Sequence, residues 1–305
     1  MHARHYDGAE DLLRLQRFNA EQIASGGSAW LQPGDIPHRL YNGLRGRDPS
    51  KYLRLWEDKT GAIAGWVILD PPNTFDIQSA REDVIVEALA WVERQLRAKI
   101  IETDLSSGND PRRDVLMRLG MTEVEDEPPY HVTERSLSLP LAEVSLPDGF
   151  SIRTAAGVHE AAMLADVHAG SFDSDWTPEL YARVMQSPGY AAEREFVVVA
   201  PDGRFAAFTV TWHDTLNKSG YFEPVGTHKD FRRLGLARAL MTHAMHAMRA
   251  AGLEAAIVVH EPPEENPASA SLYASLGFQT RYTTHLYRKV RTIKKSHPPA
   301  AQSTP

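Results

Sequence analysis

Residues 221–237 read YFEPVGTHKDFRRLGLA, and this stretch decides the fold. It predicts a strand over residues 220–227, then a short loop, then a helix that begins at Gly235. A glycine in such a loop lets successive backbone N–H groups point into one concavity, and the helix adds the positive end of its dipole. Arg232 and Arg233 add charge-assisted contacts. The stretch predicts a phosphate or pyrophosphate site, the alternative being an ordinary helix start that follows two arginines.

The loop differs from two other nucleotide-binding loops. It lacks the lysine of the GxxxxGK[ST] pattern, which excludes a nucleoside-triphosphatase loop of that kind. It also lacks the three glycines and the later acidic residue of a dinucleotide fold. Another class of phosphate-bearing ligand is therefore expected.

Helices and strands are predicted to alternate on both sides of the loop. In the second half the predicted helices cover residues 161–172, 235–250 and 268–276, and the predicted strands cover 195–200, 204–212, 220–227, 253–260 and 281–288. In the first half, strands are predicted at 52–56, 63–69 and 100–105, and helices at 83–97 and 112–119. This order predicts an α/β fold.

The sequence contains an internal repeat. Asn266 lies eleven positions before Gly277 (277 − 266), and Asn109 lies eleven positions before Gly120 (120 − 109). Residues 4–8 resemble residues 153–157 in the same way. A proline-rich and glycine-containing segment between the halves marks a linker. We therefore predict a first domain over residues 1–145, a second over 146–290 and a disordered tail over 291–305.

Composition narrows the class of protein. The chain has 305 residues, a formal net charge of −7 and no cysteine. An acidic chain is not expected to bind nucleic acid, and a chain without cysteine has no acyl-cysteine intermediate. No apolar run approaches the roughly 18 residues of a membrane span. We expect a cytoplasmic protein, monomeric or homodimeric, whose partner is a small molecule or peptide.

Two ordered motifs resemble the GNAT acetyltransferase superfamily. Arg232, Gly235 and Ala237 fill its Arg/Gln-x-x-Gly-x-Gly/Ala pattern, and Asn266-x-x-Ser269-x-x-Leu-Tyr273-x-x-Leu-Gly-Phe is similar to its later helix motif. The resemblance covers residues 151–289, and the first half matches in outline. The duplicated arrangement resembles tandem GNAT proteins, of which mycothiol synthase is one type. The implied architecture is two GNAT-like domains, each a mixed splayed sheet flanked by helices.

The resemblance implies that acetyl-CoA is the acyl-donor cosubstrate and that it lies between two parting strands, near residues 223–227 and 253–260. The backbone N–H of Val225 would face the thioester carbonyl, and Thr227 would hold the pantetheine arm. Backbone N–H groups of residues 233–237 would cradle the pyrophosphate. The residues expected to bind the cosubstrate are Val225, Gly226, Thr227, Arg232, Arg233, Leu234, Gly235, Leu236, Ala237, Asn266 and Ser269.

The same resemblance places a general acid at Tyr273, whose alternative role is packing on its helix. Glu223 lies two residues before Val225, so it is expected on the same strand face, where a carboxylate takes a proton from an incoming ammonium. A structural or substrate-orienting role for Glu223 is the alternative. His228 and His260 are alternative bases.

The first half lacks these features. The segment in the place of the phosphate loop, residues 76–83, reads DIQSARED, with no glycine and two acids at the predicted helix start. Leu116 takes the place of Tyr273. We therefore predict a degenerate first domain that packs against the catalytic one.

The expected activity is direct transfer of an acyl group from acetyl-CoA to a primary amine of a small molecule or peptide. Two alternatives remain, namely a non-catalytic acyl-CoA sensor and a scaffold that binds another anion. His243 and His246 lie three apart without a third ligand nearby, so no metal site is predicted.

Overall fold

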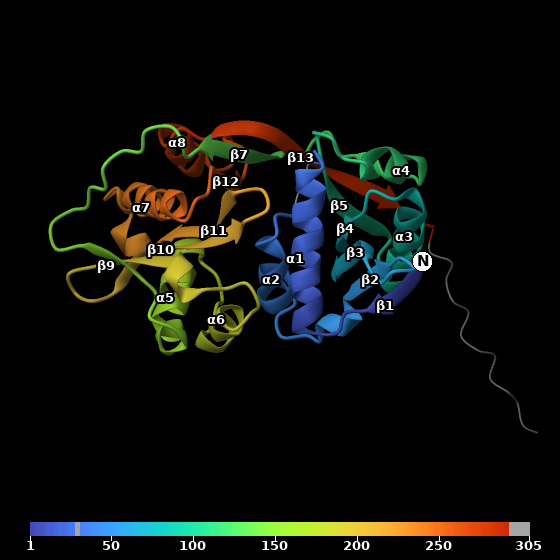
Figure 1. The fold of residues 1–305 in the computed structure, drawn as a ribbon, viewed down its shortest axis with the longest axis horizontal. Coiled ribbons are helices and arrows are strands. Elements are labelled where there is room, and N and C mark those ends of the chain that lie inside the picture. Colours follow the sequence, from blue (N-terminus) through green and yellow to red (C-terminus); the bar gives the residue numbers. More distant parts are fainter. Residues whose placement is uncertain (28–30, 293–305) are drawn as a thin grey trace, which may run out of the picture.

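The computed structural model describes residues 1–27 and 31–292. Figure 1 shows two lobes, one formed by each half of the sequence, with helices packed against a sheet that runs through both. Most of the predicted tail, residues 293–305, lies outside the described residues. Its first residue is anchored, because Arg291 N donates to Lys99 O at 2.8 Å.

The two halves repeat one order of elements. The first half contains β1 (His2–His5), α1 (Ala9–Ala24), α2 (Asp35–His38), a π-helical turn (Arg39–Gly43), a 3-10 turn (Pro49–Lys51), β2 (Leu53–Glu57), β3 (Ile63–Asp70), β4 (Thr74–Gln78), α3 (Glu82–Gln95), β5 (Ile100–Ser106), α4 (Arg112–Arg118), β6 (Thr122–Glu123) and β7 (Tyr130–Ser136). The second half contains β8 (Ser151–Thr154), a 3-10 turn (Val158–Glu160), α5 (Ala161–Phe172), α6 (Pro178–Met185), a 3-10 turn (Ala192–Arg194), β9 (Glu195–Val199), β10 (Phe205–Asp214), β11 (Ser219–Thr227), a 3-10 turn (Lys229–Phe231), α7 (Leu236–Ala250), β12 (Ala255–His260), α8 (Pro267–Ser275) and β13 (Gln279–Val290).

The predicted elements are confirmed in type, with ends that differ by a few residues. Sequence reasoning missed the helices α2 and α6 and the strands β1, β4, β6, β7 and β8. The loop predicted over residues 76–83 was wrong at its start, because Asp76, Ile77 and Gln78 belong to β4. Only residues 79–81 connect that strand to α3.

A duplicated salt bridge starts each half. Arg4 Nη2 contacts Asp11 Oδ1 at 2.6 Å, and the second Asp11 oxygen accepts from the backbone N–H of Asp7. Arg153 Nη2 contacts Glu160 Oε1 at the same 2.6 Å, and the second oxygen of Glu160 accepts from a backbone N–H three residues after the arginine. The same salt bridge thus ties the first strand of each half to the start of its first helix, in agreement with a duplicated unit.

The halves exchange strands. Among the described residues the strand order is β1-β2-β3-β4-β5-β13-β7-β12-β11-β10-β9-β8, with β6 beside β13. Residues 284–290 of β13 pair with β5 of the first half, and residues 279–284 pair with β7. In turn β7 pairs with β12 of the second half along its whole length. Figure 1 shows β13 running across both lobes.

This exchange determines what each half contains. The predicted boundary near residue 146 falls between β7 and β8, in a segment without helix or strand. A fragment that ends there would retain β7, which completes the other half's sheet, and would lose β13, which completes its own. The fold therefore depends on both halves together.

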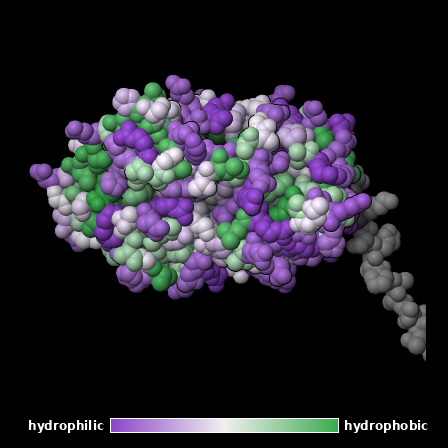
Figure 2. Space-filling view, in the orientation of Figure 1, coloured by the Kyte–Doolittle hydropathy of each residue, from purple (hydrophilic) through white to green (hydrophobic). Residues whose placement is uncertain are grey.

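Helices cover both faces of the sheet in each half and enclose apolar cores. In the second half one core lies under α7 and α8, and the other lies under α5 and α6. In the first half the corresponding cores lie under α3 and α4 and under α1 and α2. On the face shown in Figure 2, hydrophobic residues are interspersed among hydrophilic ones.

Two parallel strand pairs part, one pair in each half. In the first half the only residue pair between β4 and β5 is Thr74 with Glu102. The space beyond is occupied by Arg112, whose Nη1 donates to Ile77 O of β4 at 2.5 Å and whose Nε donates to Asp110 at 2.7 Å. Asp110 also accepts from the N–H of Ser106, at the end of β5. A buried ion pair thus bridges the parted strands.

We predict that Arg112→Ala destabilises the protein by about 3–5 kcal/mol, because removing one partner of a buried ion pair leaves an uncompensated charge. Arg118→Ala, which removes the exposed pair with Glu82, is expected to cost under about 1 kcal/mol. Urea unfolding of both variants measures the difference. Equal losses would show that the bridge between β4 and β5 contributes little.

Candidate functional site

The second parting lies between β11 and β12. Their parallel pairing begins at Ser219 with Ala255 and ends at Phe222 with Val258. Residues 223–227 of β11 continue without a partner on that side in the described part of the chain, so their backbone edge is available to a ligand. The arrangement confirms the mixed, splayed sheet.

A cavity of about 510 Å³ lies beside the parted strands. Strand β11, the loop that follows it and the helices α5, α7 and α8 provide its walls. Every residue predicted to bind the cosubstrate lines it except Leu234, which is 45 % exposed. The lining comprises Ser171, Phe172, Val225, Gly226, Thr227, Phe231, Arg232, Arg233, Gly235, Leu236, Ala237, Arg238, Asn266, Ala268, Ser269, Leu272 and Tyr273.

The loop before α7 has the geometry of an anion cradle. Arg233 and Gly235 both have left-handed backbones, with φ of 68° and 76°, which turns neighbouring N–H groups toward one side. No side chain caps the first turn of α7, so its N–H groups remain available. A Cβ at position 235 would meet no atom within 4 Å. The glycine is therefore required by its backbone conformation and not by crowding.

Arg232 lines the cavity and is also tied to a neighbouring helix. Its Nη2 donates to Ser171 O at 2.8 Å, at the end of α5. The side chain therefore anchors the loop to a neighbouring helix. Arg233 is exposed and lines the cavity. Its side chain is therefore available to contact a phosphate.

Asn266 and Ser269 lie on the cavity wall, where they form the cap of α8. Asn266 Oδ1 accepts from Ser269 N at 3.2 Å, and its Nδ2 donates to Glu261 Oε2 at 2.9 Å. An asparagine at this position satisfies an N–H group of the first turn. The asparagine side chain thus shapes the wall with both of its polar atoms already paired.

Sequence reasoning missed Arg238, which also lines the cavity. Its guanidinium donates to Ser275 Oγ at 2.5 Å and so joins α7 to the end of α8. A cationic residue one turn after the phosphate loop was the available signal. Phe172 and Phe231 were missed as well, because their approach depends on how α5 packs.

Tyr273 is buried in the same cavity wall, with its ring centroid 5.2 Å from that of His260. Burial raises the pKa of its phenol well above the ordinary value, and the charges of Glu223 and Glu261 add to this. The phenol therefore carries its proton at neutral pH. Leu116, its counterpart in the first half, is fully buried in the core under α3 and α4.

Glu223 does not share a strand face with Val225, so that expectation was wrong. Thr209 and Thr211 of β10, two apart, pair with Val225 and Phe222 of β11, three apart. Such a bulge inserts a residue and reverses the alternation of side chains. Val225 packs with the core under α7, whereas Glu223 contacts Tyr221 on the opposite face.

Burial raises the pKa of the Glu223 carboxyl, while the Tyr221 hydroxyl at 3.3 Å and the charge of Arg39 oppose that rise. The backbone of Glu223 is fixed by Trp212, whose Nε1 donates to its carbonyl oxygen at 2.9 Å. A carboxyl with a raised pKa is suited to accept a proton. Its charge reaches Tyr273, so the two groups belong to one electrostatic environment.

Glu223 and the two alternative bases all lie outside the cavity lining. His228 is buried and its Nδ1 accepts from Asp230 N at 3.2 Å, which caps the turn of residues 229–231. His260 stacks on His131 at 5.4 Å, and burial lowers the pKa of its imidazole.

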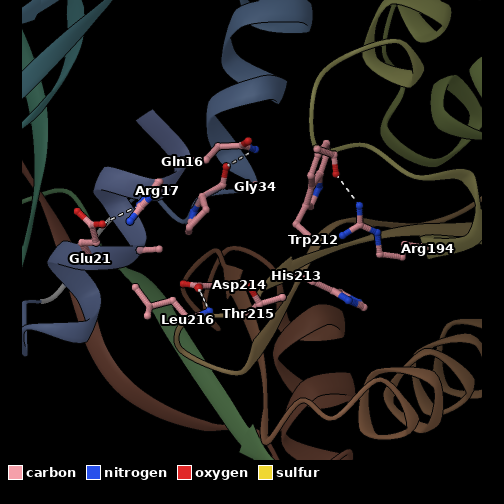
Figure 3. A pocket seen from close by; sticks show the side chains of 13 residues that line it. Gln16, Arg17, Glu21, Gly34, Arg194, Trp212, His213, Asp214, Thr215 and Leu216 are labelled. Carbon is pink, nitrogen blue, oxygen red and sulfur yellow. Dashed lines mark hydrogen bonds and ion pairs between the residues drawn. The ribbon is translucent and has the colours of Figure 1, made fainter. Parts of the chain in front are cut away.

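A second pocket, of about 490 Å³, lies at the junction of the halves. Figure 3 shows Gln16 and Gly34 of the first half on one side and Trp212 and Arg194 of the second half on the other. Gly34 packs directly on the indole, because a Cβ there would lie 2.3 Å from Trp212 Cγ. This close approach sets the position of α2 against β10 and β11.

Gly34→Ala is therefore expected to force the junction apart and to cost about 1–3 kcal/mol, as overpacking does. Gly43→Ala is the matched control, because a Cβ at Gly43 meets no atom within 4 Å. Thermal unfolding of the two variants checks the difference. A wild-type melting temperature for Gly34→Ala would mean that the junction adapts.

A metal site needs several ligating side chains close together, and a membrane span needs a long apolar helix. Within residues 1–27 and 31–292, no group of three or more histidine or carboxylate side chains is arranged to hold a metal ion. His246, one of the pair considered for a metal, instead bonds the carbonyl of Ala142 through its ring. None of the helices in these ranges has the length and apolar character to cross a bilayer.

Comparison with known proteins agrees with this geometry. Residues 161–278 match the model of the acetyltransferase (GNAT) family. A mycothiol acetyltransferase of Thermomonospora curvata is 34 % identical over 151 residues, which are 47 % of this chain and 48 % of the relative. The chain thus matches about half the length of that curated relative.

Solved structures match over nearly the whole chain. A tandem GNAT protein from the clavulanic acid biosynthesis pathway has a TM-score of 0.64 at 14 % identity, covering 94 % of this chain and 97 % of the other. A GCN5-related N-acetyltransferase from Sphaerobacter thermophilus has a TM-score of 0.60 at 16 % identity, covering 94 % and 95 %. At these identities the likeness establishes the fold.

Proposed function

Because residues 161–278 form a GNAT-family acetyltransferase domain within a tandem GNAT fold, we propose that this protein transfers the acetyl group of acetyl-CoA directly to a primary amine of a small molecule or peptide. One observation carries the proposal. The phosphate loop, the open edge of β11 and a buried tyrosine meet around a single cavity. The parts needed to hold and to cleave a thioester are thus adjacent.

In this proposal the backbone holds the cosubstrate. N–H groups of residues 233–237 bind the pyrophosphate, and Thr227 pairs with the pantetheine arm in the manner of a strand. The N–H of Val225 faces the thioester carbonyl, where a fixed donor stabilises the oxyanion that forms on attack. Arg233 adds a cation at the mouth of the cradle, and Asn266 and Ser269 support its wall.

Glu223 accepts a proton and Tyr273 donates one. Glu223 accepts one from the ammonium group of the acceptor, so that the nitrogen lone pair attacks the thioester carbon. The nitrogen of the tetrahedral intermediate loses its second proton to solvent, the carbon–sulfur bond breaks, and Tyr273 donates its proton to the departing thiolate. The products are the amide and the free thiol of CoA, and solvent restores the two side chains.

The alternative is an acyl-CoA sensor that has kept the cavity and lost turnover. It would bind acetyl-CoA and release no thiol with any amine. Tyr273 lies in the cavity wall with a raised pKa, and the charge of Glu223 reaches it. This favours the enzyme, because perturbed groups of complementary roles close together are typical of catalytic sites.

Gly235→Glu is expected to abolish acetyl-CoA binding, because it places a carboxylate in the cradle and a side chain on a left-handed backbone. Calorimetric titration of acetyl-CoA measures the effect. Ala80→Glu is the control, since it puts the same change at the exposed, corresponding turn of the first half.

Wild type and Ala80→Glu should each bind one equivalent. If Gly235→Glu binds like wild type, the cradle lies elsewhere. If wild type itself fails to bind, the acyltransferase proposal is overturned.

Tyr273→Phe is expected to lower kcat about 10²-fold or more, which is the contribution of a positioned general acid, while acetyl-CoA binding stays within about twofold. Thiol release measures kcat. Tyr287→Phe, a change at a buried tyrosine of the first-half core, serves as the control and should retain wild-type kcat. An unchanged kcat for Tyr273→Phe would assign the tyrosine to packing.

A further inference from the structure

The first half brings a carboxylate to Glu223. Asp35 is the first residue of α2, and its Oδ2 accepts from the N–H of Gln32 at 2.7 Å. The hydroxyl of Tyr221 hydrogen-bonds to both carboxylates, to Glu223 Oε2 at 3.3 Å and to Asp35 on the other side. Two acids from opposite halves therefore meet around one phenol.

The junction holds this pair in place. Gly34, the residue before Asp35, packs on Trp212 as described above. The same tryptophan donates through Nε1 to the carbonyl oxygen of Glu223. One rigid side chain thus fixes the backbone next to each carboxylate.

The cation that stabilises these two carboxylates is shared with other acids. Arg39, in the turn after α2, opposes the raised pKa values of both Asp35 and Glu223. It is shared, because its guanidinium also lies 3.6 Å from Asp76 and 3.9 Å from Asp70. A purely structural pair would be expected to have its own cation, since buried charges are usually paired. The arrangement suits a cation that arrives with a ligand.

We propose that Asp35 is the second carboxylate of the acceptor site, where it and Glu223 together hold the alkylammonium group of the incoming amine. This inference rests on the proposed acetyl transfer and names its substrate class, an alkylamine that is protonated in water. Glu223 takes the proton during attack, and Asp35 is a positioning residue. The first half thereby contributes to the acceptor site while its own strand parting is closed by Arg112.

The charged and titratable groups that face the pair set its response to pH. They are Tyr221 on β11, Arg39 after α2 and Tyr273 on α8, whose pKa is raised by burial and by the charge of Glu223. Burial raises the pKa of each carboxyl, and the charge of Glu223 raises that of Asp35 further. The folded protein therefore binds more protons than the unfolded chain between the ordinary carboxyl pKa and the raised value, and stability falls as pH rises through that window.

The first test measures melting temperatures of wild type, Asp35→Asn and the control Asp114→Asn, whose aspartate is exposed on α4. At about pH 8.5 Asp35→Asn should melt higher than wild type, because one buried negative charge is gone, and at about pH 4 the two should coincide. Asp114→Asn should follow wild type throughout. A lower melting temperature for Asp35→Asn at the higher pH would assign Asp35 to capping and overturn the proposal.

The second test measures kinetics with n-butylamine and with aniline, which is neutral at pH 7. Asp35→Asn should raise the KM for n-butylamine at least tenfold, leave the KM for aniline and acetyl-CoA binding within about twofold, and move the acid limb of kcat/KM to lower pH. Asp35→Glu should recover part of the loss. Equal effects on the two amines, or an unmoved pH profile, would overturn the inference.

The two failures are distinguishable. If wild type acetylates neither amine, the proposed function fails for this substrate class. Binding of n-butylamine to wild type and Asp35→Asn, measured by calorimetry, then decides the role of Asp35. Equal affinity of the two proteins would overturn the inference.

Discussion

The end of the pairing between β11 and β12 is the constraint on which the site depends. Parallel strands that stay paired leave no backbone group for a ligand, whereas these separate after Phe222 and Val258. The free edge, the cavity and the loop before α7 all follow from that separation. The bulge between Phe222 and Val225 then places Val225 and Glu223 on opposite faces of the strand. Val225 faces the core and cavity under α7, and Glu223 faces the junction with the first half.

In the first half a pair of parallel strands also separates, but protein side chains fill the space between them. Strands β4 and β5 part as well, but Arg112 and Asp110 bridge them and satisfy the polar groups that the parting exposes. A buried ion pair of this kind replaces the contacts that a bound molecule would make. The duplicated architecture thus supports two outcomes, an open cavity in one half and a closed, structural junction in the other.

The sequence was sufficient where an interaction is local. The cradle was predictable because Arg233 and Gly235 act through their own backbone, and the duplication was predictable because Arg4 and Arg153 each reach a residue seven positions later in the chain. The exchange of β7 and β13 was not, since nothing local tells a strand which sheet it completes. The bulge at Glu223 was missed for a related reason, as strict alternation is the expectation until the partner strand is known.

The strand exchange also holds the two halves in a fixed arrangement. With β7 in the second sheet and β13 in the first, the halves cannot drift apart without breaking backbone pairing. A fixed junction allows a residue of one half to act in the site of the other. Gly34 packs on Trp212 at that junction. This contact brings Asp35 close to the face of β11 that carries Glu223. The junction is therefore a rigid wall, where Asp35 of the first half and Glu223 of the second share Tyr221 as a hydrogen-bond partner.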